Sequence, residues 1–251
     1  MNSSVQTAPL LEVRNLSKHF GAVRALNDFS MVVRPGEVVA LAGDNGAGKT
    51  TLIKAISGVY QPTGGEILLR GQPVSFTTPQ EAREKGIETI YQDLALADNL
   101  SIGANIFLGR EPMRKAFGFL PVLDRKAMAA AAKETMSRLD FHVSRLEAPV
   151  SNFSGGQRQA VAIGRAVYWD AQILIMDEPT AALGVPEQRK VISLIHQLKA
   201  QGRGVIFISH NLHDIFAVSD RIVVLRRGVQ AGERKISETN HDEVVKLMVG
   251  G

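Results

Sequence analysis

Short apolar runs rich in β-branched residues recur along the chain and predict strands. Six such runs stand out: Glu37–Ala42, Glu66–Leu69, Ile87–Tyr91, Ile173–Met176, Val205–Ser209 and Ile222–Leu225. Several are apolar at consecutive positions, as expected where both faces of a sheet are covered. Helical patterns separate some of the runs, which favours an α/β fold with a mainly parallel central sheet. More frequent strand and turn signals up to Gly71 predict a small antiparallel β layer in the N-terminal part.

The middle of the chain has a different pattern. From Asp93 to about Asp170 there is little strand signal, and Asp124 is a suitable N-cap for an Ala-rich helix over Arg125–Leu139. A second helix is expected after Ser154. We therefore predict a helical subdomain over residues 93–170, inserted into an α/β core formed by residues 1–92 and 171–251.

Two signals bound the helix that follows the fourth run. Pro186 stands at the favoured first-turn position, and Gly202 is a suitable terminator. Between them, apolar residues at helical spacing predict a core-facing stripe.

The composition is that of an ordinary globular protein and excludes several classes. The chain has 251 residues, of which 45% are hydrophobic and 22% charged, and it has no cysteine. Disorder, a disulfide framework and a thiolate zinc site are therefore excluded. The net charge of +4 leaves open a nucleic acid, an anionic membrane surface or a polyanionic small ligand as partner. No run approaches 18 apolar residues and the first ten residues do not resemble a signal peptide, so we expect neither a membrane span nor secretion.

The strongest motif follows the first predicted strand run. It fits the pattern G-x-x-x-x-G-K-[ST] and consists of Gly43, Asp44, Asn45, Gly46, Ala47, Gly48, Lys49 and Thr50. Glycines let successive backbone N–H groups converge on phosphate oxygens, and the following helix adds the positive end of its dipole. Lys49 would reach the β- and γ-phosphates, and the Thr50 hydroxyl would ligate Mg²⁺. The motif predicts a nucleotide phosphate site.

A second signal is the apolar run Ile173–Met176, which ends in Asp177 and Glu178. A buried strand that ends in Asp177 would place its carboxylate beside the Mg²⁺ of the nucleotide. Glu178 would then face the attacking water and act as general base. A strand that ends in acids is common, so this interpretation depends on the phosphate motif.

Four further elements, in a fixed order, complete a resemblance to the ATP-binding-cassette (ABC) ATPases. The residues Ser154, Gly155, Gly156 and Gln157 resemble the family's signature sequence at the head of a helix. Gln92 matches the Q-loop, His210 the switch histidine and Phe20 the aromatic residue that stacks on adenine. The resemblance covers nearly the whole chain, which would then be one ABC ATPase domain over residues 1–251 with a P-loop NTPase core.

This resemblance implies a site shared by two cassettes that pack head-to-tail around two ATP molecules. One face of each nucleotide would be held by Lys49, Thr50, Thr51, Gln92, Asp177, Glu178 and His210. Thr50, Gln92 and Asp177 would hold Mg²⁺, while Glu178, Gln92 and His210 would serve catalysis. Ser154, Gly156 and Gln157 of the other protomer would grip the γ-phosphate. A homodimer could build two such sites.

One position departs from the family pattern. The family usually has Asp at the end of the loop after Glu178, whereas the loop Thr180–Leu183 is followed here by Gly184. In the family that Asp helps to hold the two cassettes together. Its absence leaves the expected ATP binding unchanged but puts the expected communication between protomers in doubt.

Within the family, the stretches Tyr91–Leu96, Asn99–Ile102, Asn105–Arg110 and Ala181–Val185 most resemble ATPases of monosaccharide uptake. Ribose, xylose and fructose importers belong to that class, and a single intact cassette is closest to the ATP-binding proteins of fructose import. The resemblance implies a peripheral protein on the cytoplasmic side of the cell membrane. Its partners would be permease subunits and, indirectly, a periplasmic sugar-binding protein.

Several alternatives remain at this point. The importer could carry a different solute, since the ATPase does not touch it. A nucleic-acid-associated ABC ATPase is supported only by the basic charge, and we expect no nucleic acid partner. A small-molecule kinase would not need Ser154–Gln157. The pair His210 and His213 could suggest a metal, but no third ligand is visible.

Overall fold

The computed structural model describes residues 8–141, 145–181 and 183–250. Its main feature is a six-stranded sheet whose strands are, in spatial order, β12 (Val229–Lys235), β11 (Arg221–Arg226), β3 (Val38–Ala42), β10 (Gly204–Ile208), β9 (Ile173–Asp177) and β6 (Ile87–Ile90). Only the edge strand β12 runs antiparallel to its neighbour. The carboxyl ends of β3, β10, β9 and β6 therefore meet at one edge of the sheet, where the loops that follow them come together.

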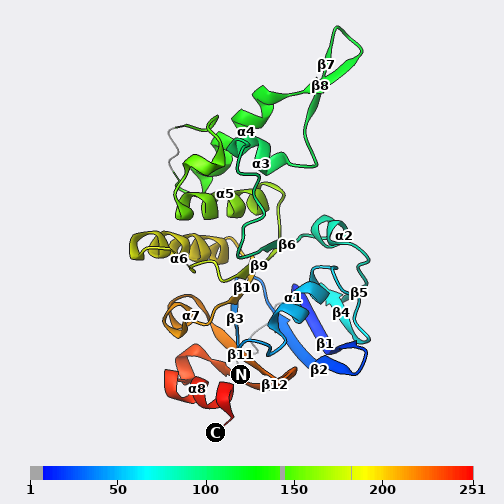
Figure 1. Ribbon diagram of the computed structural model, residues 1–251, viewed down its shortest axis with the longest axis vertical. Coiled ribbons are helices and arrows are strands. Elements are labelled where there is room, and N and C mark those ends of the chain that lie inside the picture. Colours follow the sequence, from blue (N-terminus) through cyan, green and yellow to red (C-terminus); the bar gives the residue numbers. More distant parts are fainter. Residues whose placement is uncertain (1–7, 142–144, 182, 251) are drawn as a thin grey trace, which may run out of the picture.

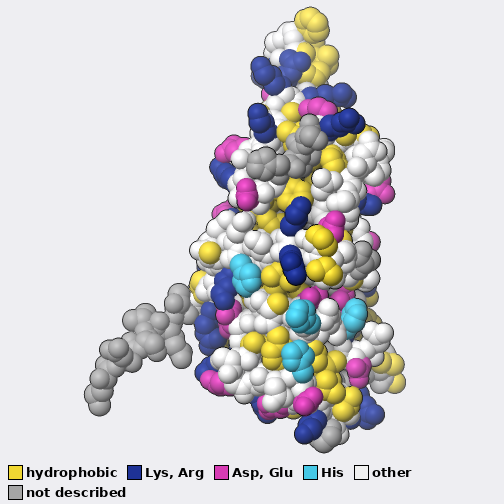
Figure 2. Space-filling view, turned by 90° about the vertical axis from the view of Figure 1, so that its left-hand side faces the viewer, with side chains coloured by type: hydrophobic (Ala, Val, Ile, Leu, Met, Phe, Trp, Pro, Cys, Tyr) yellow, Lys and Arg dark blue, Asp and Glu magenta, His cyan; other side chains and the backbone are white. Residues whose placement is uncertain are grey.

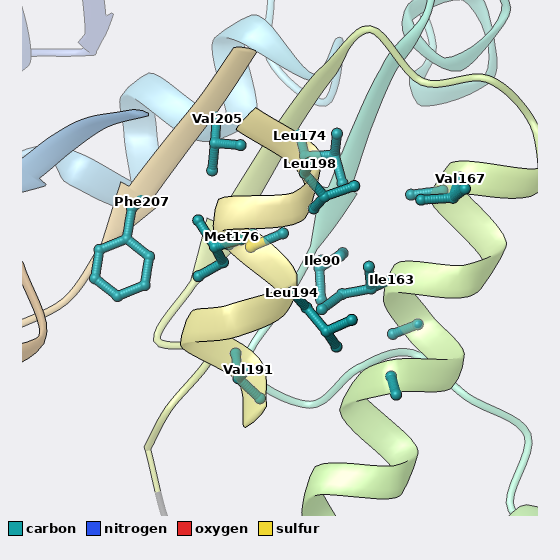
Figure 3. Close-up of a cluster of buried hydrophobic side chains, with 14 of the residues drawn as sticks. Ile90, Ile163, Val167, Leu174, Met176, Val191, Leu194, Leu198, Val205 and Phe207 are labelled. Carbon is teal, nitrogen blue, oxygen red and sulfur yellow. The ribbon is translucent and has the colours of Figure 1, made fainter. Parts of the chain in front are cut away.

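The strands of this sheet are buried on both faces. In β3, Val38 and Ala40 belong to the core on one side of the sheet, whereas Val39 and Leu41 belong to the core on the other side. Figure 3 shows the first of these cores, where side chains of β9 and β10 pack against helices α5 (Gly155–Tyr168) and α6 (Val185–Ala200). Burial on both faces explains the unbroken apolar runs in the sequence.

A second, antiparallel sheet is formed by the N-terminal part of the chain. Its strands are, in spatial order, β2 (Val23–Val33), β1 (Leu11–Phe20), β4 (Gly64–Leu69) and β5 (Gln72–Val74). Leu11 pairs with Val33 on one side and with Leu69 on the other. This sheet confirms the predicted antiparallel layer, and together with the parallel sheet it confirms the predicted α/β fold class.

Further helices surround the core, and α6 begins and ends near the expected residues. They are α1 (Lys49–Ile56), α2 (Pro79–Glu84), α6, α7 (Leu212–Val218) and α8 (His241–Val249), with a short 3₁₀ helix at Ile236–Glu238. Pro186 lies in the first turn of α6, and Gly202 has a φ of +81° just beyond its end. Among the residues that the structure describes, no helix is long and apolar enough to cross a bilayer.

Three helices lie together at one end of the molecule (Figure 1): α3 (Ile102–Phe107), α4 (Arg125–Arg138) and α5. A 3₁₀ helix at Val150–Asn152 precedes α5. As predicted, Asp124 caps α4, because its Oδ1 accepts a hydrogen bond from the Ala127 N–H at 2.9 Å. The buried Asn105 side chain donates to three carbonyls of the preceding loop and fixes it against α3.

The same region contains a β-hairpin that sequence patterning did not predict. Within the part of the chain that the structure describes, strands β7 (Met113–Ala116) and β8 (Leu120–Leu123) pair only with each other. They project from the end of the molecule (Figure 1). Neither strand shows the alternation of apolar and polar positions that a half-buried strand requires. The turn contains Phe117 and Gly118 rather than Asn-Gly, so the usual hairpin signal is also absent.

Candidate functional site

The glycine-rich loop Gly43–Gly48 connects the buried strand β3 to helix α1, as the motif requires. Gly48 is the N-cap of α1 and has a left-handed φ of +110°. The first N–H groups of an α-helix have no partner within the helix, and those of α1 directly follow the glycine-rich loop. The loop and the helix end thus present backbone donors to one space, which suits an anion.

Two glycines of this loop are required by close backbone packing. A Cβ on Gly43 would lie 2.2 Å from the carbonyl oxygen of Leu225, and one on Gly48 would lie 2.7 Å from that of Ala25. Strands β11 and β2 therefore press against the outside of the loop. Any other residue at these two positions would push the loop open, so the narrow cradle depends on glycine.

Lys49 folds back over the loop. Its Nζ donates hydrogen bonds to the carbonyl oxygens of Gly43, at 2.5 Å, and Asp44, at 3.1 Å. Burial lowers the pKa of Lys49, while the nearby carboxylates of Glu178, Asp177 and Asp44 oppose this effect. The ammonium group is thus close to both the loop and the acids at the end of β9.

Asp177 is the last residue of β9, at the sheet edge that also carries the glycine-rich loop. Burial raises the pKa of Asp177, the charge of Glu178 raises it further, and Lys49 opposes the rise. A carboxylate that is poorly solvated and close to a second acid is a favourable ligand for a divalent cation, because the cation relieves both penalties.

Glu178 occupies a tight turn directly after β9. Its backbone has a φ of +50°, an uncommon conformation for a residue with a side chain, and its N–H donates to the Ile208 carbonyl at 2.9 Å. The turn points the carboxylate toward the end of β10. There Ser209 Oγ donates to Glu178 Oε2 at 3.3 Å, and His210 Nδ1 lies 2.9 Å from Glu178 Oε1.

The glutamate and the histidine differ in exposure. The Glu178 side chain is 15% exposed, whereas that of His210 is 76% exposed. The carboxylate is therefore held in place by two partners, and the imidazole is free to meet a ligand that enters from solvent. Sequence reasoning missed Ser209, although its position directly before His210 was a usable signal.

Most of the predicted residues line one cleft of ≈ 980 Å³. They are Gly43, Asp44, Asn45, Gly46, Ala47, Gly48, Lys49, Thr50, Thr51, Gln92, Asp177, Glu178 and His210. Six further lining residues were not predicted: Val23, Arg24, Ala25, Arg227, Gly228 and Met248. These six come from β2, the β11–β12 turn and α8, which no local motif connects with the glycine-rich loop.

Phe20 does not line this cleft. Its ring packs edge-to-face on Tyr60, with 5.2 Å between the ring centroids, and Lys18 Nζ lies 5.1 Å from the Phe20 centroid. The residues of β2 that follow it, Val23 to Ala25, line the cleft instead. Stacking of Phe20 on adenine therefore stays a prediction.

Ser154–Gln157 also lie outside the cleft, at the start of α5. A capping box orders them: Ser154 N–H donates to Gln157 Oε1 at 2.9 Å, and Gln157 N–H donates to Ser154 Oγ at 3.4 Å. Ser154, Gly156 and Gln157 line a separate hollow of ≈ 370 Å³ together with Glu187 and Lys190 of α6. In a single chain these residues and the glycine-rich loop thus belong to two distinct surfaces.

Gly184 stands where the family usually has Asp, and it lies close to the Glu187 side chain. Gly184 is the N-cap of α6, and a Cβ there would lie 2.9 Å from Glu187 Oε2. An aspartate at this position would bring a second carboxylate against Glu187. A Cβ on Gly156 would lie 2.8 Å from Glu187 Cγ, so Glu187 contacts both segments. Ala182, in the same loop, lies outside the described residues.

A buried hydrogen bond connects the loop after Glu178 with the first turn of α7, the helix that follows His210. Thr180 Oγ1 donates to Asp214 Oδ2 at 2.7 Å, and both residues are buried. The contact thus joins the segment that follows Glu178 to the helix that follows His210. In the part of the chain that the structure describes, no three His, Cys, Asp or Glu residues form a metal-binding group.

Comparison with known proteins gives results that agree with this geometry. The sequence model of the ABC transporter family matches residues 26–181. The xylose/arabinose import ATP-binding protein of Sulfolobus acidocaldarius is 50% identical, over 95% of this chain and 93% of that protein. A ribose import ATP-binding protein of Streptomyces avermitilis is 44% identical; the match covers 99% of this chain but only 48% of that protein, so the chain spans about half its length.

A solved structure also matches. An ATP-binding cassette of an ABC transporter, crystallised in its ADP conformation, superimposes with a TM-score of 0.83 at 25% identity, over 98% of this chain and 100% of that one. The matched family residues include both the glycine-rich loop and Asp177, and the matched fold includes the sheet edge that positions them. This chain therefore belongs to the ABC transporter family, and its fold is that of an ABC ATPase.

Proposed function

We propose that this protein is the ATP-hydrolysing subunit of an importer that takes up a monosaccharide through a separate membrane permease. The observation that carries the proposal is the cleft where loops after β3, β6, β9 and β10 bring the glycine-rich loop, Gln92, Asp177, Glu178 and His210 together. The sugar-import names of two relatives support the coupling to monosaccharide uptake. Fructose, the solute favoured by the sequence, stays one of several monosaccharides to be tested.

The residues of the cleft fit ATP with Mg²⁺. Gly43 and Gly48 let β11 and β2 pack closely against the outside of the loop, which keeps the cradle narrow. Lys49 would exchange its two carbonyl partners for phosphate. Thr50, Gln92 and Asp177 supply the hydroxyl, amide and carboxylate oxygens that Mg²⁺ prefers. When bound, Mg²⁺ would neutralise charge on the phosphates.

In this mechanism Glu178 would accept a proton from the water that attacks the γ-phosphate. The bond between the attacked phosphorus and the bridging oxygen breaks, and the products are ADP and inorganic phosphate. His210 contacts the Glu178 carboxylate and is mostly exposed, so it can both orient the base and face the γ-phosphate. Gln92 would help position the water and the metal.

We further propose that the site is completed by a second copy of this chain. Ser154, Gly156 and Gln157 line a hollow separate from the cleft, so a single chain cannot apply them to its own nucleotide. A twofold pair would place the α5 N-terminus of each protomer against the nucleotide of the other. The helix end and the Ser154 hydroxyl would stabilise charge on the γ-phosphate.

A mixing experiment tests this sharing. Lys49→Ala chains lack the phosphate lysine, and Ser154→Arg chains lack a competent α5 N-terminus. Each variant alone should be nearly inactive, whereas their mixture should regain ATPase activity through one intact composite site per heterodimer. Absence of recovery, in mixtures shown by differential tagging to contain heterodimers, would contradict a shared site in which one composite unit suffices.

The transport proposal places the protein at the cytoplasmic side of the membrane, beside permease subunits that receive sugar from an external binding protein. A strain that lacks the gene should lose uptake of one labelled sugar among xylose, arabinose, ribose and fructose. The wild-type gene should restore uptake, and a Glu178→Gln gene should not. Unchanged uptake of all four sugars, with ATPase activity present, would leave the ATPase intact but overturn the assignment to these sugars.

A further inference from the structure

The hairpin β7–β8 lacks the support that short hairpins usually receive. Among the described residues its two strands pair only with each other, and most of its side chains are exposed. An isolated two-stranded hairpin is only marginally stable in water, and it normally packs one face on a helix or another sheet. A hairpin that stands free at the end of a molecule is therefore expected to have a partner outside the chain.

Its tip carries large apolar side chains. Phe117 is 89% exposed and Phe119 is 79% exposed, and Leu120 beside them is about half exposed. Phe117 has a φ of +52° and Gly118 a φ of +82°, and the Phe119 N–H closes the turn on the Ala116 carbonyl at 3.3 Å. A left-handed position favours Gly or Asn, so Phe117 has an unfavourable backbone conformation while its side chain is largely exposed.

Basic side chains lie directly behind the tip. Residues 111–126 contain Arg114, Lys115, Arg125 and Lys126 against Glu111 and Asp124, so this segment carries 4 − 2 = +2 of the chain's net +4. Both acids are engaged locally, since Glu111 accepts from the Gly109 N–H and Asp124 caps α4. Within the described residues, none of the four cations forms an ion pair.

Three of the cations share a shallow hollow. Its volume is ≈ 660 Å³, and it is lined by Arg114, Ala116, Val122, Leu123, Arg125 and Lys126. The lining combines three apolar residues with three cationic ones, which suits an amphiphile with an anionic head. Figure 2 shows the resulting arrangement, with hydrophobic side chains at the upper extremity of the molecule and Lys and Arg side chains just below them.

We propose that the hairpin β7–β8 is an anchor that binds an anionic phospholipid surface. Phe117 and Phe119 would enter the boundary between headgroups and acyl chains, while Arg114, Arg125 and Lys126 would contact lipid phosphates. Aromatic residues at the tip and cations behind them match the order of apolar boundary and anionic phosphates at a bilayer interface. The hairpin is remote from the nucleotide cleft, so this proposal is independent of sugar import.

Sedimentation with vesicles tests the anchor on the full-length chain. Vesicles of phosphatidylcholine alone are compared with vesicles that contain about 30% phosphatidylserine, at about 100 mM salt. We expect the wild-type protein to partition onto the anionic vesicles. Phe117→Ser with Phe119→Ser should lower the partition coefficient about tenfold or more, because the apolar insertion is lost. Arg114→Gln, Arg125→Gln and Lys126→Gln together should lower it by roughly two orders of magnitude and abolish the preference for phosphatidylserine.

Two matched controls separate the hairpin from general surface properties. Val245→Ser with Val249→Ser removes two exposed apolar side chains from α8, at the opposite end of the molecule (Figure 1). Arg70→Gln, Lys85→Gln and Lys133→Gln remove three exposed cations elsewhere, with the same change in net charge. Both controls should partition like the wild type. Equal losses in the controls and in the hairpin variants would overturn the proposal.

A fluorescent variant tests directly whether the tip of the hairpin enters the membrane, without relying on a loss of binding. The chain has a single tryptophan, so Phe117→Trp adds one reporter at the tip. Its emission should shift to the blue with anionic vesicles and not with neutral ones. Emission that stays unchanged while the protein co-sediments would place the lipid contact elsewhere. If no form binds vesicles and the double Phe variant instead weakens self-association on a sizing column, the hairpin is an interface between copies and the lipid proposal is wrong.

Discussion

The two halves of the proposed nucleotide site are built by different physical means. The half at the sheet edge gathers ionisable side chains at or just beyond the ends of buried strands, and Lys49, Asp177, Glu178 and His210 are among them. The half at the start of α5 has no ionisable residue among Ser154–Gln157 and is ordered by a capping box. One half has strained backbone and shifted pKa values, and the other has an ordinary helix end.

This difference indicates how the two halves divide their work. Ionisable groups at the sheet edge can move protons, hold a metal and respond to charge, and their positions are fixed by strands that cannot shift without opening the core. A neutral helix end can only offer N–H groups and a hydroxyl to a ligand that is already bound. We therefore expect substitutions at the sheet edge to reduce the rate of ATP hydrolysis or the affinity for ATP. Substitutions at the start of α5 should lower the stability of the fold and weaken the coupling between protomers.

The largest expected effect is on turnover. Glu178→Gln keeps the shape of the side chain and can still contact His210 and Ser209, but it cannot accept a proton from water. We expect the rate of ATP hydrolysis to fall by about 10²–10⁴-fold, with ATP affinity retained. Single-turnover phosphate release and nucleotide binding measure the two quantities separately.

The matched control is Glu84→Gln, which makes the same chemical change at an exposed position on α2. It should hydrolyse ATP at the wild-type rate. A Glu178→Gln protein with near-normal turnover would remove this residue from the role of base. The proposal that the sheet-edge half carries out the proton transfer would then lose its main support.

The next effect concerns affinity. Lys49→Ala deletes the ammonium group that caps the glycine-rich loop, and the lost charged hydrogen bonds should weaken ATP binding by about 1.5–3 kcal/mol, or roughly 10–150-fold. Isothermal titration at fixed Mg²⁺ measures this change. Lys54→Ala, farther along α1, is the control and should bind ATP normally. Unchanged affinity in Lys49→Ala would mean that the lysine does not reach the phosphates.

The same contrast explains what could be predicted from the sequence. The glycine-rich loop, Asp177 and Glu178 were found because buried strands and tight turns leave local signatures, and the structure brings them into one cleft. Arg227 and Met248 also line that cleft, but they reach it through folding of distant segments and carry no local signature. The hairpin β7–β8 was missed because, among the described residues, its strands pair only with each other and are mostly exposed. Their apolar and polar positions therefore need not alternate.

A smaller effect is expected at the other half. Ser154→Ala removes the acceptor for the Gln157 N–H and should lower the free energy of unfolding by about 1 kcal/mol. It should also reduce ATPase activity, because the hydroxyl would face the partner's nucleotide. Thr78→Ala, which removes the equivalent cap of α2, should cost similar stability and leave ATPase activity unchanged. Equal activity in the two variants would make Ser154 a structural cap only.

The smallest effect is a change of stability with pH at Asp177. Because the folded protein raises the pKa of this carboxyl, its ionised form is better tolerated in the unfolded chain. Without nucleotide and Mg²⁺, Asp177→Asn should therefore be slightly more stable than the wild type near neutral pH. The advantage should shrink as the pH falls through the raised pKa, and vanish below the ordinary value for aspartate, where both states are protonated.

Urea denaturation across this range, with the exposed Asp93→Asn as control, measures the difference. Adding Mg²⁺ with ATP should reverse the order, since the cation needs the carboxylate and should stabilise the wild type more than Asp177→Asn. An Asp177→Asn protein that is less stable than the wild type at neutral pH without ligand would show that the carboxylate supports the fold. In that case ionised Asp177 would not destabilise the folded protein without a metal. The sheet-edge half would then not sacrifice stability at this residue in order to bind Mg²⁺.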